Sequence, residues 1–191
     1  MFNCGVPQGS VLGPTLFILY INDLCKVSKI LKFILFADDS NIFYTNKCYT
    51  KLFSDVNKEL CNLSEWFRLN KLTLNVNKTN YMLFGRKRRP VSSDNALLKI
   101  DGTAIECVSK TKFLGVIVDD KFSWSDHISV VNNKISKSLG MMYKAKFLLN
   151  EKCMLMLYNS LILPYLDYCC EIWGNTYKSN LSKIIVSQKR S

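Results

Sequence analysis

The stretch LKFILFADDSNIFY, from Leu31 to Tyr44, most constrains how this chain can fold. Two adjacent acids, Asp38 and Asp39, stand between runs of large apolar residues. Such runs around a short polar segment predict a β-hairpin with buried strands LKFILF and NIFY and the turn ADDS. A carboxylate held away from water is costly unless a counter-charge meets it. The pattern therefore predicts a cation at the tip of the hairpin.

A hard divalent cation fits this prediction. Mg²⁺ takes oxygen ligands and often binds through one or two carboxylates together with substrate phosphates. Two such ions can stabilise both the attacking and the leaving oxygen of a phosphoryl transfer. We therefore expect Mg²⁺ as the cofactor, with Mn²⁺ as an alternative. The competing interpretation is that Asp-Asp-Ser is an ordinary solvated turn.

Composition and charge indicate a globular chain with a polyanionic partner. The 191 residues are 48% hydrophobic, enough for one substantial core and a small second domain. A net charge of +11 favours nucleic acid or an acidic membrane surface. No apolar run reaches the roughly 18 residues of a membrane span. We expect no membrane segment and an intracellular location, with the nucleus favoured over the cytoplasm.

The eight cysteines and the single histidine, His127, exclude several classes of chemistry. The cysteines show no CxxC spacing, which argues against zinc and against a disulfide framework. We expect them to be reduced and mostly buried. One histidine also argues against a histidine-based hydrolytic mechanism.

The order of patterns along the chain predicts an α+β unit to about Val118 and then a small helical domain. Apolar spacing and prolines predict helices from Pro14 to about Lys26, over 50–70 and over 151–163. Strands are predicted at KLTLN, NYMLFG and TKFLGVIV, and a hairpin at Asp101-Gly102. The segment YLDYCCEIWG is expected to pack back on the helices after the break at Pro164.

A further helix follows DDKFSW and has two different faces. Its apolar face consists of Ile128, Val131, Ile135, Leu139 and Met142, and its opposite face carries Lys134, Lys137 and Lys144. The apolar face is expected to meet the core, and the lysine face solvent or an anion.

Four motifs in order resemble those of one enzyme family. FADD, at Phe36 to Asp39, resembles the aromatic-Ala-Asp-Asp box of reverse transcriptases, and GVPQGSVLGPTLFILYINDL resembles the Gly-rich segment that precedes it. Together with LTLNVNKTNYMLF and KFLGVIVDDKFSW, they most resemble non-LTR (LINE-type, jockey-like) retrotransposon reverse transcriptases. This resemblance implies an incomplete polymerase palm, an antiparallel sheet with covering helices, over 1–122. It also implies a helical thumb over 123–175 and a basic C-terminal tail over 176–191.

The resemblance assigns roles to residues of these motifs. The implied catalytic residues are Asp38 and Asp39, as metal ligands, and Lys78, near the leaving pyrophosphate. The implied nucleotide-binding residues are Gln8, Gly9, Ser10, Phe36 and Ala37. The implied primer-gripping hairpin contains Phe113, Leu114 and Gly115. Each has a purely structural alternative: a glycine-rich loop before a helix, an ordinary surface lysine, and an apolar core strand.

Two basic features are candidates for nucleic-acid contact. The loop residues Arg86, Lys87, Arg88 and Arg89 suit phosphate binding or nuclear import. The face of Lys134, Lys137 and Lys144 suits a thumb helix lying along a template-primer duplex. Both runs are equally compatible with a solvated surface.

The implied partners are an RNA template, a DNA primer and deoxynucleoside triphosphates. The family also needs a third carboxylate upstream of the Gly-rich segment, and the chain begins four residues before that segment. We therefore expect a fragment with an exposed apolar sheet edge, little polymerase activity alone, and another chain as a source of the missing strand. The alternatives are a non-catalytic nucleic-acid-binding or assembly protein and a pseudogene product.

Overall fold

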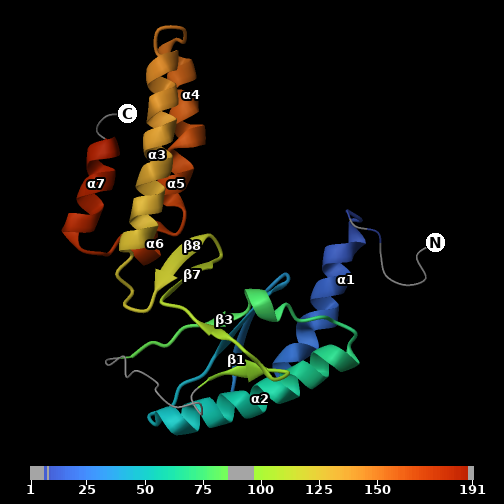
Figure 1. Ribbon diagram of the computed structural model, residues 1–191. Helices are drawn as coiled ribbons and strands as arrows, with labels where there is room; N and C mark the ends of the chain where they lie inside the picture. The colour runs from blue at the N-terminus through green and yellow to red at the C-terminus, as the bar shows by residue number, and fades with distance from the viewer. Residues whose placement is uncertain (1–6, 8, 86–96, 189–191) are drawn as a thin grey trace. The chain divides into compact units, whose positions relative to one another are not determined.

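The computed structural model describes residues 7, 9–85 and 97–188, and these fall into two compact units. The described part of 1–81 and 87–107 forms the first unit, and the described part of 82–86 and 108–191 forms the second (Figure 1). Both units combine helices with small sheets, so the α+β fold class is confirmed.

The first unit carries the hairpin and the helix that follows it. Its elements are α1 (Leu12–Ile21), η1 (Asn22–Lys26), β1 (Lys32–Phe36), β2 (Asp39–Phe43), α2 (Tyr49–Leu69), η2 (Val76–Lys78), β3 (Asn80–Tyr81), β4 (Lys99–Ile100), β5 (Thr103–Ala104) and β6 (Glu106–Cys107). Strands β1 and β2 pair antiparallel, as do β4 and β5, and β3 pairs with β6 in parallel. The described sheet is thus divided into two-stranded pieces.

The hairpin predicted from LKFILFADDSNIFY is confirmed, with a shorter turn than expected. Phe36 pairs with Asp39, so only Ala37 and Asp38 form the turn. Ala37 takes the left-handed conformation, with φ of 51°, which a two-residue hairpin turn demands. The prediction of buried strands was wrong, because Ile34 remains 48% exposed and Phe36 60% exposed.

Helix α2 follows the predicted apolar spacing and supplies the core of the first unit. Phe53, Leu60 and Leu63 are its buried residues. They recur at steps of seven and three, which places them on one face of a helix. Phe53 also meets the ring of Tyr81 edge-on, with 6.2 Å between centroids. Helix α2 therefore joins β3 to the core.

The predicted strand at KLTLN was wrong, and NYMLFG forms a strand only at Asn80–Tyr81. Lys71 adopts a left-handed conformation, and the Leu72 N–H donates to the Phe67 carbonyl, so these residues terminate α2. Asn75 then accepts a hydrogen bond from the Lys78 N–H and starts the short helix η2. Local capping by polar residues thus overrides the alternating apolar pattern.

The hairpin predicted at Asp101-Gly102 is confirmed. Both turn residues have positive φ, 49° and 79°, as a type I′ turn requires. Helix α2 holds this hairpin from two positions. The Asn57 side chain accepts from the Lys99 N–H at 2.9 Å, and the Ser64 hydroxyl donates to Asp101. The first bond satisfies a backbone N–H of β4, and the second holds the side chain of the turn residue Asp101.

The second unit is a hairpin followed by helices. Its elements are β7 (Lys110–Phe113), β8 (Val116–Asp119), α3 (Ser125–Ala145), α4 (Glu151–Leu161), α5 (Leu163–Asp167), α6 (Cys170–Trp173) and α7 (Lys178–Gln188). TKFLGVIV was predicted as one strand and is instead two, because Leu114 and Gly115 both take positive φ and form a tight turn.

The helical core confirms the two-faced pattern predicted for α3. Its buried cluster is Ile128, Val131, Ile135, Met142, Ile162, Trp173 and Ile184. Ile184 belongs to α7, which lies in the stretch expected to be a basic tail. Helix α7 packs against α3. Leu181 and Ile184 are spaced three apart, so this segment buries an apolar face of its own.

Burial shows that the expectation for the cysteines was wrong, and it places the single histidine in the core. The cysteines were expected to be mostly buried, yet those at 25, 48, 61, 107 and 170 are exposed, and all described cysteines are free thiols. His127 is 5% exposed, accepts a hydrogen bond from the Ile117 N–H at its Nδ1, and meets Trp173 edge-on. It is therefore a core residue. No helix in the described residues could cross a bilayer.

Candidate active site

The hairpin tip presents the two acids at one end of a twisted ribbon. Directly opposed residues of a hairpin share a face, so the Asp39 and Phe36 side chains lie on the same side of the sheet. That side also carries the exposed Ile34 and Phe43, whereas Phe33 and Leu35 on the other side are half-buried. Asp39 therefore borders the more exposed face.

A hydrogen-bonded cluster fixes the base of the hairpin to α2. The Tyr44 hydroxyl donates to Oδ2 of Asp55 at 2.6 Å, and the Asn46 amide donates to the Tyr44 oxygen at 3.1 Å. The hydrogen bond to Asp55 raises the pKa of Tyr44, since the phenol proton is held by the carboxylate. The base of the hairpin is thereby fixed to the first half of α2.

The carboxylates of Asp38 and Asp39 are exposed and available for a ligand. Among the described residues, none donates a hydrogen bond to either carboxylate or forms an ion pair with it. Two adjacent oxygen-bearing groups suit the donor preference of Mg²⁺. No group of three or more His, Cys, Asp or Glu forms a metal centre in the part of the chain that the structure describes. The pair thus fits a partial cation site.

The loop before α1 is described at Gly9 and Ser10, whereas Gln8 lies outside the described residues. Gly9 has φ of 84°, and the Ser10 hydroxyl accepts from the Gly13 N–H at 3.1 Å. Ser10 therefore satisfies one of the free N–H groups in the first turn of α1. No described hydrogen bond joins this loop to the turn of Asp38, so nucleotide binding by Gly9 and Ser10 remains a prediction.

Lys78 is the last residue of η2 and its side chain is exposed. Its backbone N–H lies 3.1 Å from the Asn75 carbonyl and 3.3 Å from the Asn75 side-chain oxygen. Asn75 thus fixes the backbone at this position and leaves the ammonium group in solvent. A role near a leaving pyrophosphate remains a prediction.

The residues assigned to a primer-gripping hairpin form the turn between β7 and β8. The Leu114 carbonyl accepts from the Tyr168 hydroxyl at 2.5 Å. A Cβ on Gly115 would lie 3.2 Å from the Tyr168 ring. Phe113 is half-buried. The turn is therefore held within its own unit by Tyr168, and a function in primer binding remains a prediction.

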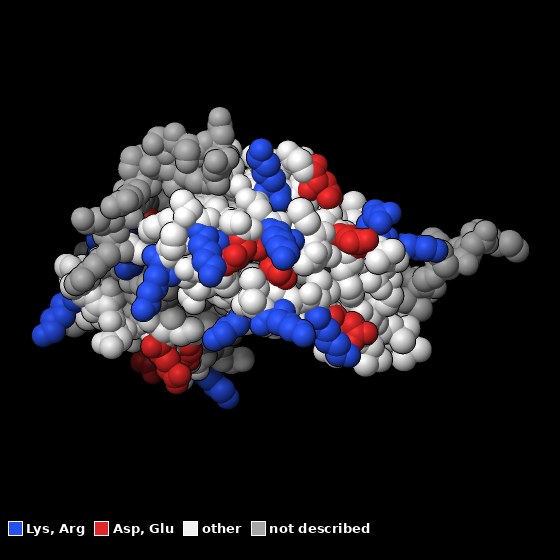
Figure 2. All heavy atoms as spheres, turned by 90° about the horizontal axis from the view of Figure 1, so that it is seen from below, with Lys and Arg blue, Asp and Glu red and all other residues white. Residues whose placement is uncertain are grey.

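The basic candidates differ in how much of them the structure describes. Residues 86–89 lie outside the described part of the chain. Lys134, Lys137 and Lys144 are exposed on α3, and Lys134 Nζ lies 4.9 Å from the centroid of the Tyr165 ring. In the view of Figure 2, lysine and arginine side chains are interspersed with acidic ones.

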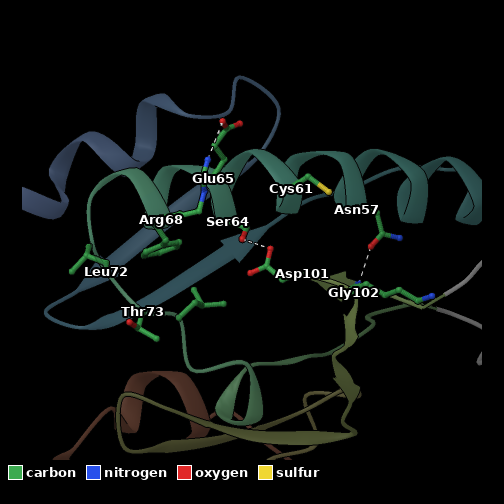
Figure 3. Close-up of a pocket in the computed structure, with 12 residues that line it drawn as sticks. Asn57, Cys61, Ser64, Glu65, Arg68, Leu72, Thr73, Asp101 and Gly102 are labelled. Carbon is green, nitrogen blue, oxygen red and sulfur yellow. Dashed lines mark hydrogen bonds and ion pairs between the residues drawn. The ribbon is translucent and has the colours of Figure 1, made fainter.

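A groove of about 680 Å³ lies beside α2 and does not include the acids of the hairpin. Figure 3 shows Ser64 and Asp101 pointing toward one another across it, and Arg68 turned toward Glu65. Its polar groups thus already pair with each other in part. The exposed acids of the hairpin are therefore better candidates for a metal site than this groove is.

Sequence reasoning missed the structural role of Asp119. This carboxylate accepts hydrogen bonds from the backbone N–H groups of Lys121, Ser123 and Trp124 and from the Ser123 hydroxyl. Burial alone would raise its pKa, but the hydrogen bonds from Ser123 and Lys121 outweigh burial and lower it. The signal in DDKFSW was an aspartate followed four residues later by serine before a helix.

Comparison with known proteins places the chain in a family. Residues 1–118 match the model of the family described as reverse transcriptase (RNA-dependent DNA polymerase). This match spans more than half of the chain, and the chain therefore belongs to the reverse transcriptase family. No solved structure matches it.

Its relatives are polymerases of mobile elements. It is 30% identical to the probable RNA-directed DNA polymerase from transposon X-element of Drosophila melanogaster, over 97% of this chain and 21% of that protein. It is 28% identical to the probable polymerase from transposon BS of the same species, over 100% of this chain and 22% of that protein. It is 24% identical to the RNA-directed DNA polymerase from mobile element jockey of Drosophila melanogaster, over 98% of this chain and 21% of that protein. The chain thus spans about a fifth of these curated relatives.

Proposed function

We propose that this chain supplies one part of an RNA-directed DNA polymerase active site. Asp38 and Asp39 bind Mg²⁺, or Mn²⁺ in its place, and the substrates are deoxynucleoside triphosphates, an RNA template and a DNA primer. The reaction is attack of the primer 3′-hydroxyl on the α-phosphate of the nucleotide. The metal, when bound, supplies charge stabilisation for the attacking and leaving oxygens.

The observation that carries this proposal is the hairpin tip. Exposed acids occupy two consecutive positions there, Asp38 in the turn and Asp39 at the start of β2, and no described residue pairs with them. A hairpin turn that served only for folding has no need of two adjacent like charges, which repel each other. The hydrogen bond of Tyr44 to Asp55 fixes the base of the hairpin that carries these acids.

Other residues of the family motifs act on the nucleotide and the strands. Phe36 and Ala37 border the acids and contact the nucleotide, and Gly9 with Ser10 allows close approach of its backbone. Lys78 neutralises charge that develops on the leaving pyrophosphate. The turn containing Leu114 contacts the primer, and the lysines of α3 contact strand phosphates.

The direct test is Mg²⁺-dependent binding of a deoxynucleoside triphosphate. Asp38→Ala removes one of two charged ligands, and we expect the affinity to fall at least ~10-fold, as metal sites lose this much even when outer groups are removed. Asp23→Ala is a matched control, because Asp23 is an exposed acid of the same unit that pairs with Lys26. Equal binding by wild type and Asp38→Ala would overturn the proposal.

The rival is a protein that kept a basic surface and lost the reaction. The observation in its favour is the exposed lysine face of α3, which needs no metal to bind phosphates. Duplex binding that is unaffected by Asp38→Ala, in a chain that binds no nucleotide with Mg²⁺, would favour it. Template-directed extension by the 191-residue chain at an ordinary polymerase rate would contradict our expectation of low activity alone.

A further inference from the structure

The second unit contains an aromatic pocket that the polymerase assignment does not use. Its volume is about 330 Å³, at the lower end of the range of about 300 to 1,000 Å³ found for ligand sites. It is lined by Phe122, Trp124, Asn175, Thr176 and Tyr177. From these contacts we propose that it binds an unstacked base of single-stranded nucleic acid.

Two rings of the pocket are unusually exposed. Phe122 is 54% exposed and Tyr177 is 77% exposed. Phe122 stacks on Phe84 with 4.8 Å between centroids and 13° between planes, which makes a rigid two-ring platform. Trp124 lies 6.0 Å from Phe122 and anchors the site to the helical core. Exposed aromatic faces of this kind stack on bases of any sequence.

The loop that carries the rings is held in a strained conformation. Phe122 and Trp124 have φ of 51° and 60°, which bulky residues rarely adopt. The carboxylate of Asp119 holds this conformation through its hydrogen bonds to the loop backbone. Such strain persists where the surrounding structure imposes it, and it is concentrated at binding sites.

The opposite wall is tied to the same loop and offers a polar group. The Thr176 hydroxyl donates to the Ser123 carbonyl at 3.1 Å, and the Asn180 amide donates to the same oxygen at 3.2 Å. The Asn175 side chain forms no hydrogen bond with the described residues. Its amide can both donate and accept, so it can pair with the edge of a base.

The charge around the pocket favours nucleic acid over a peptide. Each exposed ring has a lysine next to it in the chain, Lys121 before Phe122 and Lys178 after Tyr177, and both lysines are exposed. Two acids precede the loop: Asp119 accepts hydrogen bonds from the backbone and hydroxyl of Ser123, and Asp120 also has an interaction partner. A strand that stacks one base here would place its phosphates among cations.

The test compares two ligands with the full chain: a fluorescent oligothymidine and an abasic strand of the same length. Stacking of one base contributes about 1 to 3 kcal/mol, so wild type should bind the oligothymidine about 5- to 150-fold more tightly than the abasic strand. Tyr177→Ala and Phe122→Leu should abolish this difference. Phe147→Leu should retain it, because Phe147 is 79% exposed and follows the opposite end of α3.

Equal affinity of wild type for both strands would overturn the inference, as would retention of the difference in both pocket variants. The inference would also be overturned if a proline-rich peptide displaced the oligothymidine while Tyr177→Ala still bound the oligothymidine more tightly than the abasic strand. The near-ultraviolet circular dichroism spectrum of each variant is compared with that of wild type to check that the variant is folded. Asp38→Ala should leave base discrimination unchanged, so this inference and the proposed metal site fail independently.

Discussion

Asp119, a half-buried acid, should contribute more to the stability of the second unit than the exposed acids near it. Its two oxygens accept from three backbone N–H groups and one hydroxyl, and they organise the turn that leads into α3. A single capping side chain contributes about 0.5 to 2 kcal/mol. Because Asp119 serves three N–H groups, we expect Asp119→Ala to lower the free energy of unfolding by about 2 kcal/mol.

A milder change at the same position separates the two oxygens. Asparagine keeps one acceptor oxygen, so it can serve either the Lys121 side or the Trp124 side of the loop. Asp119→Asn should therefore cost about 1 kcal/mol, half the effect of alanine. Asp167→Asn is the control, because Asp167 is exposed and has no hydrogen bond among the described residues, and it should change stability by less than about 0.5 kcal/mol.

The assay is urea unfolding followed by tryptophan fluorescence in a Trp66→Phe background. Trp124 and Trp173 then report on the second unit alone. The lowered pKa of Asp119 also fixes the pH dependence: its contribution is complete above the ordinary value of 3.8 and is lost as the pH falls through the folded pKa. The reasoning is refuted if Asp119→Asn matches Asp167→Asn, or if the stability difference is the same at pH 3 and pH 7.

Three further predictions concern the core, the turns and the histidine. Ile135→Ala, at a fully buried position, should cost about 2 to 5 kcal/mol in urea unfolding, whereas Val130→Ala, at a 39% exposed position, should cost far less. Gly102→Ala places a side chain at φ of 79° and should destabilise by about 1 kcal/mol, while Gly140→Ala, inside α3 with open space around it, should stabilise by about 0.5 to 1 kcal/mol; opposite signs would contradict the assigned turn and helix. Burial and then Lys134 lower the pKa of His127, so its Cε1 proton resonance should titrate below 6.5, and a midpoint at or above 6.5 would contradict the burial of the neutral ring.

The sequence predicted those parts of the fold that depend on local chemistry. Asp101-Gly102 defines its turn because both residues tolerate positive φ, and the spacing of Ile128, Val131 and Ile135 defines a helix face. KLTLN was mistaken for a strand because its alternation is real, yet Lys71 ends α2 there and Asn75 starts η2. The apolar period alone does not show whether a segment forms strand hydrogen bonds or ends and caps a helix.

The site divides in the same way. Asp38 and Asp39 were predicted because two adjacent acids between apolar strands are chemically unusual. The aromatic pocket was not predicted, because Phe122 and Tyr177 lie 55 positions apart and both line it only in the folded unit, where hydrogen bonds also join Ser123 to Thr176 and Asn180. Contacts between residues so distant in the chain depend on tertiary packing, which no local pattern encodes.

The most direct test of the proposed metal site is the broadening of amide resonances by Mn²⁺ in the ¹⁵N-labelled chain. Substoichiometric Mn²⁺ should first broaden the resonances of residues 37–40, and Asp38→Asn combined with Asp39→Asn should abolish this effect. The matched variant Asp23→Asn should leave it intact. Broadening that begins at another acid, or that persists in the double variant, would contradict the assignment of these carboxylates as metal ligands.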